Sequence, residues 1–377
     1  MIPIYPLYAI MFGEHGIGPF ELSILFSIWA LIGIATEIPS GALADTFSRK
    51  WLIVASGIIK ASAFYTWYLW QDFYGYALGF LLWGFASSIR SGAWEALLHD
   101  VLKQQSKENL FTRHYGRIRA VGTAGVVLGE LMGGYLIIQG FSVVLLISAV
   151  IPILASAQFA FMTTDPPVNE KVSKPGYLNH LRSGVHEAIT NKSILYILLV
   201  FTFLIIASGI LDEYVNPIIF EHGFTMSTVA YLAAGIVLAE ALGQAMSGRF
   251  SFLSLEQLLG CMAAATTILL LIQPLHGFWI PLCMALFFAI FGMASTLFAG
   301  QLQHQIKGSS RATVTSVVSL GDGIGAIIWF MAFGSLAEAT SMTFATLGFA
   351  LVTILSCGLF FLLGRLWNIT HVNHSDS

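Results

Sequence analysis

Apolar segments of the length of a membrane-spanning helix follow one another along the whole chain, separated by short polar or glycine-containing loops. A helix needs roughly 20 mainly apolar residues to cross the hydrocarbon core of a bilayer. The composition agrees, because 56% of the 377 residues are hydrophobic and only 10% are charged, whereas about a quarter of a soluble domain is charged. The sequence therefore predicts an all-α integral membrane protein embedded in a lipid bilayer.

A chain of this length has room for about a dozen spans joined by short loops. We expect helices over the ranges 1–13, 20–43, 51–70, 75–101, 116–138, 141–163, 193–216, 226–248, 252–273, 277–302, 312–335 and 340–366. The first segment is too short to span, so we expect a truncated first helix. Either the true start lies upstream, or this half is completed in an unusual way.

A long charged connection divides the segments into two equal sets. We expect an N-terminal six-helix bundle over 1–163 and a C-terminal six-helix bundle over 193–367. Between them, 164–192 forms a linker with a stretch that can become an amphipathic helix on the membrane surface. Residues 368–377 form a tail.

The distribution of Lys and Arg predicts the orientation. Lys60 and Arg90 lie within predicted spans, and the other Lys and Arg residues lie in or next to alternate connections and at the C-terminal end. Positively charged loops remain on the cytoplasmic side of a membrane. We therefore expect a multi-pass protein of the inner or plasma membrane, with the linker and both chain ends in the cytoplasm.

Two sequence patterns recur in the two halves. The tripeptide Glu-His-Gly occurs at 14–16 and again at 221–223. The segments RAVGTAGVVLGELMGG and RATVTSVVSLGDGIGA, aligned on their first two residues, place Glu130 opposite Asp322. Internal repeats of this kind are common in transporters, and here each half has one acid at the same place in its fifth predicted helix.

The loop after the second segment reads GALADTFSRK and resembles the cytoplasmic loop motif of the major facilitator superfamily. The resemblance implies two pseudo-symmetric six-helix bundles and a gating role for Gly41, Asp45, Arg49 and Lys50. Asp45 can accept charge-assisted hydrogen bonds from Arg49 or from a neighbouring helix end. An ordinary positively charged loop is the alternative.

The fifth segment is similar to a second motif of that superfamily, a glycine-rich helix found in many exporters. Four glycines match and are expected to permit close helix packing, namely Gly125, Gly129, Gly133 and Gly134. Glu130 stands where the motif has proline, and this departure weakens an argument for export from the motif alone. The overall pattern is most similar to that of bacterial drug/proton antiporters.

Charged residues within spans are rare and usually mark ion pathways or relays. Acids outnumber the two bases, and desolvation favours the neutral form of a carboxyl, so we interpret four acids as proton-coupling residues. These are Glu130, Asp322, Glu240 and Glu37. The alternative for Glu130 and Asp322 is a structural carboxyl that hydrogen-bonds to another helix. For Lys60 we expect an ion pair with Glu37 or another acid of the second helix.

The fourth helix lines the central cavity in the architecture that the resemblance implies. Arg90, Glu95 and Trp94 are therefore our candidates for substrate contacts, with salt bridges between helices as the alternative for the two charged residues. Arg90 and Trp94 are four residues apart and can form a cation–π contact.

These features favour a proton-coupled secondary transporter that moves a small organic molecule by alternating access, with efflux of a cationic or amphipathic compound as the first candidate. Proton-linked uptake of a zwitterionic or anionic metabolite or a siderophore is the alternative within transport. A sensor or scaffold built on a transporter fold is the alternative outside it. Neither catalytic motifs nor phosphate-binding loops occur, so we expect no enzyme, no catalytic residue, no metal, no cofactor and no nucleic-acid partner, and a monomer.

Overall fold

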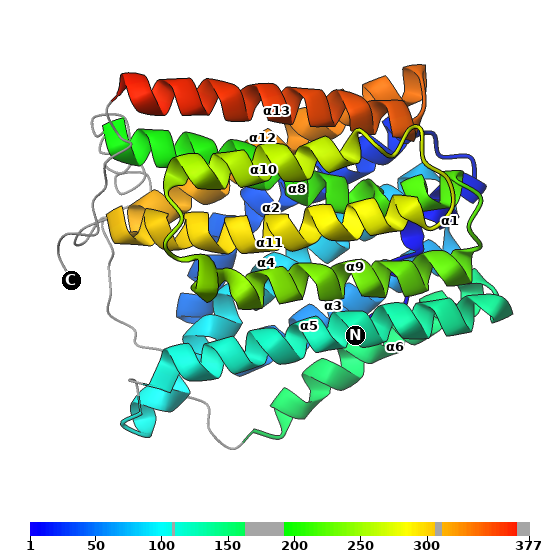
Figure 1. The fold of residues 1–377 in the computed structure, drawn as a ribbon. Coiled ribbons are helices and arrows are strands. Elements are labelled where there is room, and N and C mark those ends of the chain that lie inside the picture. The colour runs from blue at the N-terminus through cyan, green and yellow to red at the C-terminus, as the bar shows by residue number, and fades with distance from the viewer. Residues whose placement is uncertain (108–109, 163–191, 306–310, 368–377) are drawn as a thin grey trace. The chain divides into compact units, whose positions relative to one another are not determined.

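The computed structural model describes all residues except 108–109, 163–191, 306–310 and 368–377. Some side chains inside the helices, including those of Glu37, Asp45 and 311–319, also lie outside the described residues. All regular elements of the described part are helices, and none is a strand, which confirms the all-α expectation. Figure 1 shows the helices as long rods joined by short loops.

The helices are α1 (Tyr8–Glu14), α2 (Pro19–Thr46), α3 (Arg49–Leu69), α4 (Phe73–Gln104), α5 (Phe111–Leu136), α6 (Phe141–Ala160), α8 (Lys192–Glu221), α9 (Met226–Met246), α10 (Leu255–Leu269), α11 (Trp279–Gln305), α12 (Arg311–Ala339) and α13 (Met342–Leu366). The short 3-10 helices η2 (Ile137–Gln139) and η3 (Ser247–Phe250) follow α5 and α9. By length and apolarity, nine of the described helices can cross a membrane. The other three are α1 with 7 residues, α10 with 15, and α4, in which several charged residues interrupt the apolar sequence.

The helix expected over 1–13 begins only at Tyr8. Pro3 and Pro6 have no N–H group to donate, and each disfavours helical geometry in the residue before it. The preceding residues form turns instead, in which the N–H of Leu7 donates to the carbonyl of Ile4 at 2.9 Å. The prolines therefore give this stretch an irregular backbone.

Contacts divide the chain into two compact units. Unit 1 comprises Met1–Lys174 and Phe224–Ala234, and unit 2 comprises Pro175–Gly223 and Gly235–Ser377. The start of α9 thus groups with unit 1. The domain limits expected at 163 and 193 remain a prediction.

In unit 1, α3 packs against both α4 and α6, and α2 packs against α4. The α3–α6 crossing depends on Gly57, where a Cβ atom would lie 2.6 Å from the carbonyl oxygen of Pro152 and would also overlap Ser156. A cluster of aromatic rings fills the interior, where Phe12 of α1 stacks on Tyr76 with centroids 3.9 Å apart. This cluster holds α1 against α3 and α4.

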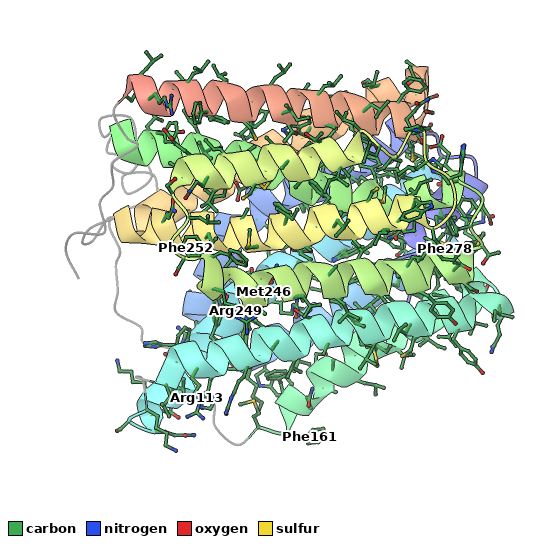
Figure 2. The ribbon with its side chains drawn as sticks, in the orientation of Figure 1. Arg113, Phe161, Met246, Arg249, Phe252 and Phe278 are labelled. Carbon is green, nitrogen blue, oxygen red and sulfur yellow. The ribbon has the colours of Figure 1, made fainter. Side chains whose placement is uncertain are left out.

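In unit 2, α10 packs between α11 and α13, and α8 contacts α11, α12 and α13. Figure 2 shows Arg249 and Phe252 at the end of the unit where α9 joins α10. Phe278 lies at the opposite end, just before α11. Arg249 and Phe278 therefore mark opposite ends of the same unit.

The glycine of the repeated Glu-His-Gly tripeptide has a positive φ angle in both units. Gly16 and Gly223 have φ values of 85° and 86°, in the left-handed region that favours glycine at the end of a helix. His15 Nδ1 lies 2.6 Å from the Tyr76 hydroxyl at the start of α4, and Glu221 accepts from the Thr343 N–H at 3.2 Å at the start of α13. Each tripeptide thus joins the end of one helix to the start of another within its own unit.

Candidate functional site

Lys60 lies on α3 inside unit 1 and is surrounded by aromatic groups. Its ammonium donates to the Tyr5 hydroxyl at 2.7 Å. It also lies 5.4 Å from the ring centroid of Tyr5 and 5.0 Å from that of Trp83. The two rings are parallel, with centroids 5.1 Å apart and an interplanar angle of 4°. A cation over an aromatic face gains more when it is desolvated, so this arrangement stabilises a charge that lipid would oppose.

Arg90 lies close enough to Lys60 for the two positive charges to interact. Trp83 and Arg90 are seven residues apart on α4, about two helical turns, so they lie on the same side of that helix. Neither base forms an ion pair with any carboxylate whose position is described. The expected ion pair of Lys60 is therefore absent among these residues, and its described contacts are aromatic rings and a hydroxyl. The suggested partner Glu37 lies outside the described side chains.

The other two candidates on α4 contact a different helix. Glu95 accepts from the Tyr115 hydroxyl of α5 at 3.0 Å, and the Trp94 ring stacks on Tyr115 with centroids 6.3 Å apart. The described side chains show no contact between the Arg90 guanidinium and the Trp94 ring. The three cavity candidates therefore separate into Arg90 near Lys60, and Glu95 with Trp94 against α5.

Glu130 is buried on α5, with 6% of its surface exposed. The adjacent Gly129 meets the N-terminal segment, because a Cβ there would lie 2.6 Å from the Ile2 nitrogen. Gly133 similarly faces the backbone of Pro3, and Gly125 has open space except for Met1 at 3.5 Å. The glycine stripe thus accommodates the irregular segment that precedes α1.

Gly134 lies against a different neighbour, the Tyr231 ring of α9. A Cβ atom at Gly134 would be 2.5 Å from this ring. A side chain here would displace the ring or the backbone oxygen of Ser227, 3.0 Å away. The four glycines therefore do not share one partner.

Asp322 lies on α12 in unit 2, one residue after Gly321, whose Cβ position would be 3.4 Å from the Thr202 methyl group of α8. The Oδ1 atom of Asp322 is buried and has no hydrogen-bond partner among the described residues. On α8, the amide oxygen of Asn216 is likewise buried without a described partner. Gly129 and Gly321, the residues that precede the two acids, each lie against the first segment of their own half.

Glu240 lies on α9 and accepts from the Gln244 amide at 2.9 Å. Its carboxylate is near enough to Asp212 of α8 for the two charges to interact. No base among the described residues forms an ion pair with Glu240, Asp212 or Asp322. Unit 2 therefore has acids within its helices that no described cation neutralises.

The predicted gating loop is joined to α4 and α6. Arg49 forms an ion pair with Asp100 near the end of α4, and its Nε donates to the Ala44 carbonyl at 3.3 Å. Lys50 donates to the Met162 carbonyl at 2.9 Å. Gly41 has no neighbour within 4 Å of a Cβ position, and the side chain of Asp45 lies outside the described residues. Asp100, which the loop motif alone did not identify, is thus the described acidic partner of the loop.

Sequence reasoning missed Lys60, Tyr5 and Trp83 as a group. A lysine inside a span was a usable signal, but we interpreted it as half of a structural ion pair. The seven-residue spacing of Trp83 and Arg90 was a second signal. The contact of Tyr5 with Lys60 depends on how the turns before α1 lie against α3, which the sequence does not give.

Comparisons with known proteins show where this architecture occurs. The model of the Major Facilitator Superfamily matches residues 1–329. A Na(+), Li(+), K(+)/H(+) antiporter of Planococcus maritimus is 26% identical over 176 residues, which are 45% of this chain and 40% of the antiporter. Multidrug resistance protein MdtH of Shigella sonnei is 25% identical over 186 residues, or 45% and 44% of the two chains. The matched segment thus spans less than half of either relative.

Solved structures agree in fold. A mutant of the nucleoside transporter NupG superposes with a TM-score of 0.80 at 16% identity, covering 95% of this chain and 94% of NupG. A bacterial homologue of the human lysosomal transporter Spinster, in an inward-facing and unoccupied conformation, gives 0.70 and covers 98% and 99%. At this identity the likeness concerns the fold alone.

Proposed function

Since the chain belongs to the major facilitator superfamily of membrane transporters, we propose that it is a proton-coupled secondary transporter that moves a small organic molecule by alternating access. Membership of this family makes the chain a multi-pass membrane protein with a small-molecule substrate. Proteins of this family are transporters and not enzymes. Coupling to protons, the substrate class and the direction of transport are the proposed parts.

The observation that supports proton coupling is Asp322, a carboxyl inside a spanning helix with one oxygen buried and without a described hydrogen bond. An ionised carboxylate in such a place is costly, and no described base offsets its charge. A carboxyl that takes up a proton on one side and releases it on the other can couple transport to a proton gradient. Glu130 and Glu240 are the other described proton-coupling candidates, and Glu37 is proposed from sequence alone.

Two substrate classes have support. Efflux of a cationic or amphipathic compound is supported by the acids of unit 2 and by the names of the relatives, one a cation/proton antiporter and the other a multidrug resistance protein. Uptake of a zwitterionic or anionic metabolite is supported by Lys60 and Arg90 in unit 1. Their two positive charges interact, and no described acid forms an ion pair with either of them. The geometry around Lys60 favours the second class for a site within unit 1.

Inverted membrane vesicles that contain the protein test proton coupling. Respiration acidifies the vesicle interior and quenches acridine orange, and a proton-coupled substrate added outside changes the quenching. We expect a response to at least one probe in a panel of sodium, potassium, tetraphenylphosphonium, ethidium, 2-naphthoate and benzoate. Vesicles with the Asp322→Asn protein should give none. A response of equal size from Asp322→Asn would contradict the role proposed for this acid.

We also propose that the end of unit 1 with Arg49 and Lys107 faces the cytoplasm and that the loop with Glu14 faces outward, because positive charge is retained inside. In a variant without Cys261, Cys283 and Cys357, an impermeant maleimide should label Glu14→Cys from outside intact cells and leave Lys107→Cys unlabelled. Both positions are exposed. Labelling of Lys107→Cys before the cells are opened would reverse the orientation. Glu14 is preferable to Gly16, whose φ of 85° makes a cysteine there strained.

The ion pair between Arg49 and Asp100 predicts a gating effect. Asp100→Asn removes a partly buried charge pair that joins the loop to α4, so one conformational state loses stability relative to the other. We expect transport to slow roughly tenfold while the yield of folded protein stays close to normal. The exposed pair of Arg365 and Glu256 in unit 2 is the control, and Glu256→Gln should transport normally. Equal rates for Asp100→Asn and wild type would exclude the gating role.

A further inference from the structure

The surroundings of Lys60 contain more positive charge than the described protein neutralises. Its ammonium donates to the Tyr5 hydroxyl and lies 5.0 Å from the centroid of the Trp83 ring, and its charge interacts with that of Arg90. Charged groups inside a membrane protein normally pair with one another or line a pathway. No carboxylate among the described side chains forms an ion pair with either base. An anion from outside the protein would offset both charges.

The same place has aromatic surface and a further hydrogen-bond donor. Tyr5 and Trp83 form a parallel stack with centroids 5.1 Å apart, and Trp29 lies beside Trp83 at 6.3 Å between centroids. The indole N–H of Trp29 is buried and has no hydrogen-bond partner among the described residues. Buried donors are nearly always satisfied, so an acceptor atom of a bound molecule is a fitting partner for it.

We propose that unit 1 contains a binding subsite for a small aromatic anion, in which the anionic group lies between Lys60 and Arg90 and the ring lies against the aromatic side chains of Tyr5, Trp83 and Trp29. The inference rests on the proposed transport function and specifies its substrate class. A carboxylate gains charge-assisted hydrogen bonds from both bases, and a ring gains apolar contact and favourable stacking. An organic cation of the same shape meets two like charges and is disfavoured.

Three probes of equal ring size separate charge from shape, namely 2-naphthoate, 2-naphthamide and 2-naphthylmethylammonium. Each is added to the purified full-length protein in detergent without any pH gradient, and binding is measured by thermal shift and titration calorimetry. A ligand that binds only the folded state raises its apparent stability. We expect stabilisation by 2-naphthoate alone. Equal or greater stabilisation by the cation, or none by any probe, would overturn the proposal.

Variants then assign the binding to Lys60. Lys60→Met keeps side-chain length and removes the charge, and it should weaken 2-naphthoate binding about tenfold or more. Lys60→Arg should restore part of the affinity, which a purely structural role would not produce. Arg365→Met is the matched control, because Arg365 lies 4.4 Å from the centroid of the Phe361 ring in another cation–π pair. The Arg365→Met protein should bind 2-naphthoate with wild-type affinity. Unchanged affinity in Lys60→Met would exclude the subsite.

Lys60→Met is expected to fold, since it replaces a charge within a span by an apolar side chain. If it does not remain monodisperse, Lys60→Gln serves in its place with the same expected loss. An arm with short-chain phosphatidylglycerol distinguishes a lipid headgroup from a soluble solute. Stabilisation by this lipid that is lost in Lys60→Met, without stabilisation by 2-naphthoate, would contradict the aromatic-anion assignment.

These experiments distinguish a failure of the proposed binding subsite from a failure of the proposed proton coupling. If 2-naphthoate binds at Lys60 but no probe of the panel changes the acridine orange signal, the proposed proton coupling is contradicted and the subsite remains. If a cationic probe drives proton movement and 2-naphthoate does not bind, proton coupling remains and the subsite is excluded.

Discussion

Asp322→Asn is expected to remove transport driven by a pH gradient while leaving the protein folded and able to bind its substrate. Asparagine has nearly the same shape as aspartic acid and can hydrogen-bond, but it cannot take up or release a proton. The buried Oδ1 of Asp322 has no described hydrogen bond that the substitution would break. In proteoliposomes with an imposed pH gradient, accumulation of the probe that responds in vesicles should fall to the level of protein-free liposomes.

Exchange of the same probe down its own concentration gradient should survive in Asp322→Asn, because alternating access itself needs no proton. Glu130→Gln tests the equivalent position in the first half, and we expect it to lose gradient-driven transport as well. Glu256→Gln is the matched control, since it removes a unit 2 carboxylate at the start of α10 that pairs with Arg365. Full gradient-driven transport by both Asp322→Asn and Glu130→Gln would make these carboxyls structural.

Gly57→Val is expected to prevent normal folding of unit 1. A Cβ atom at Gly57 would lie 2.6 Å from the Pro152 carbonyl oxygen and overlap the Ser156 side chain, and backbone atoms cannot move aside as the end of a flexible side chain can. Inserting atoms into a closely packed interior typically lowers the free energy of unfolding by about 1–3 kcal/mol. Because the overlap at Gly57 involves backbone atoms, we expect a loss at or above the upper end of this range. We expect little monodisperse protein after solubilisation and a much lower unfolding temperature.

Gly33→Val provides the control for this substitution. Gly33 lies in α2 and has nothing within 4 Å of a Cβ position, so the same side chain meets open space. It should leave yield and unfolding temperature close to wild type. Combining Gly57→Ala with Ser156→Gly should recover part of the loss caused by Gly57→Ala alone, because one of the two overlapping neighbours is removed. Equal stability of Gly57→Val and Gly33→Val would contradict the close α3–α6 crossing.

The sequence by itself determined the number and approximate bounds of the long helices. Segment length, apolarity and the polar loops are local properties, and lipid requires a spanning backbone to satisfy its own hydrogen bonds. The expected range 51–70 became α3 at Arg49–Leu69, and the range 226–248 became α9 at Met226–Met246. Two segments are shorter than expected: Pro3 and Pro6 delay the first helix to Tyr8, and the range 252–273 became α10 at Leu255–Leu269.

The sequence also identified the family correctly from GALADTFSRK and the glycine-rich fifth helix, since both are short contiguous motifs. It paired Glu130 with Asp322, and the structure shows that the glycine before each acid touches the first segment of its own half. The roles of these acids in proton coupling remain predictions.

Only the tertiary structure decided the partners of the charged residues. Lys60 contacts Tyr5 and Trp83, which are 55 and 23 positions away in the chain, and Arg49 pairs with Asp100. Such contacts depend on how each helix is rotated about its axis and which neighbour it packs against. Neither property follows from local composition, because a nearly uniformly apolar helix has no strongly polar face that fixes its rotation. The packing of glycines and aromatic rings between helices sets that rotation, and with it the charges that meet inside unit 1.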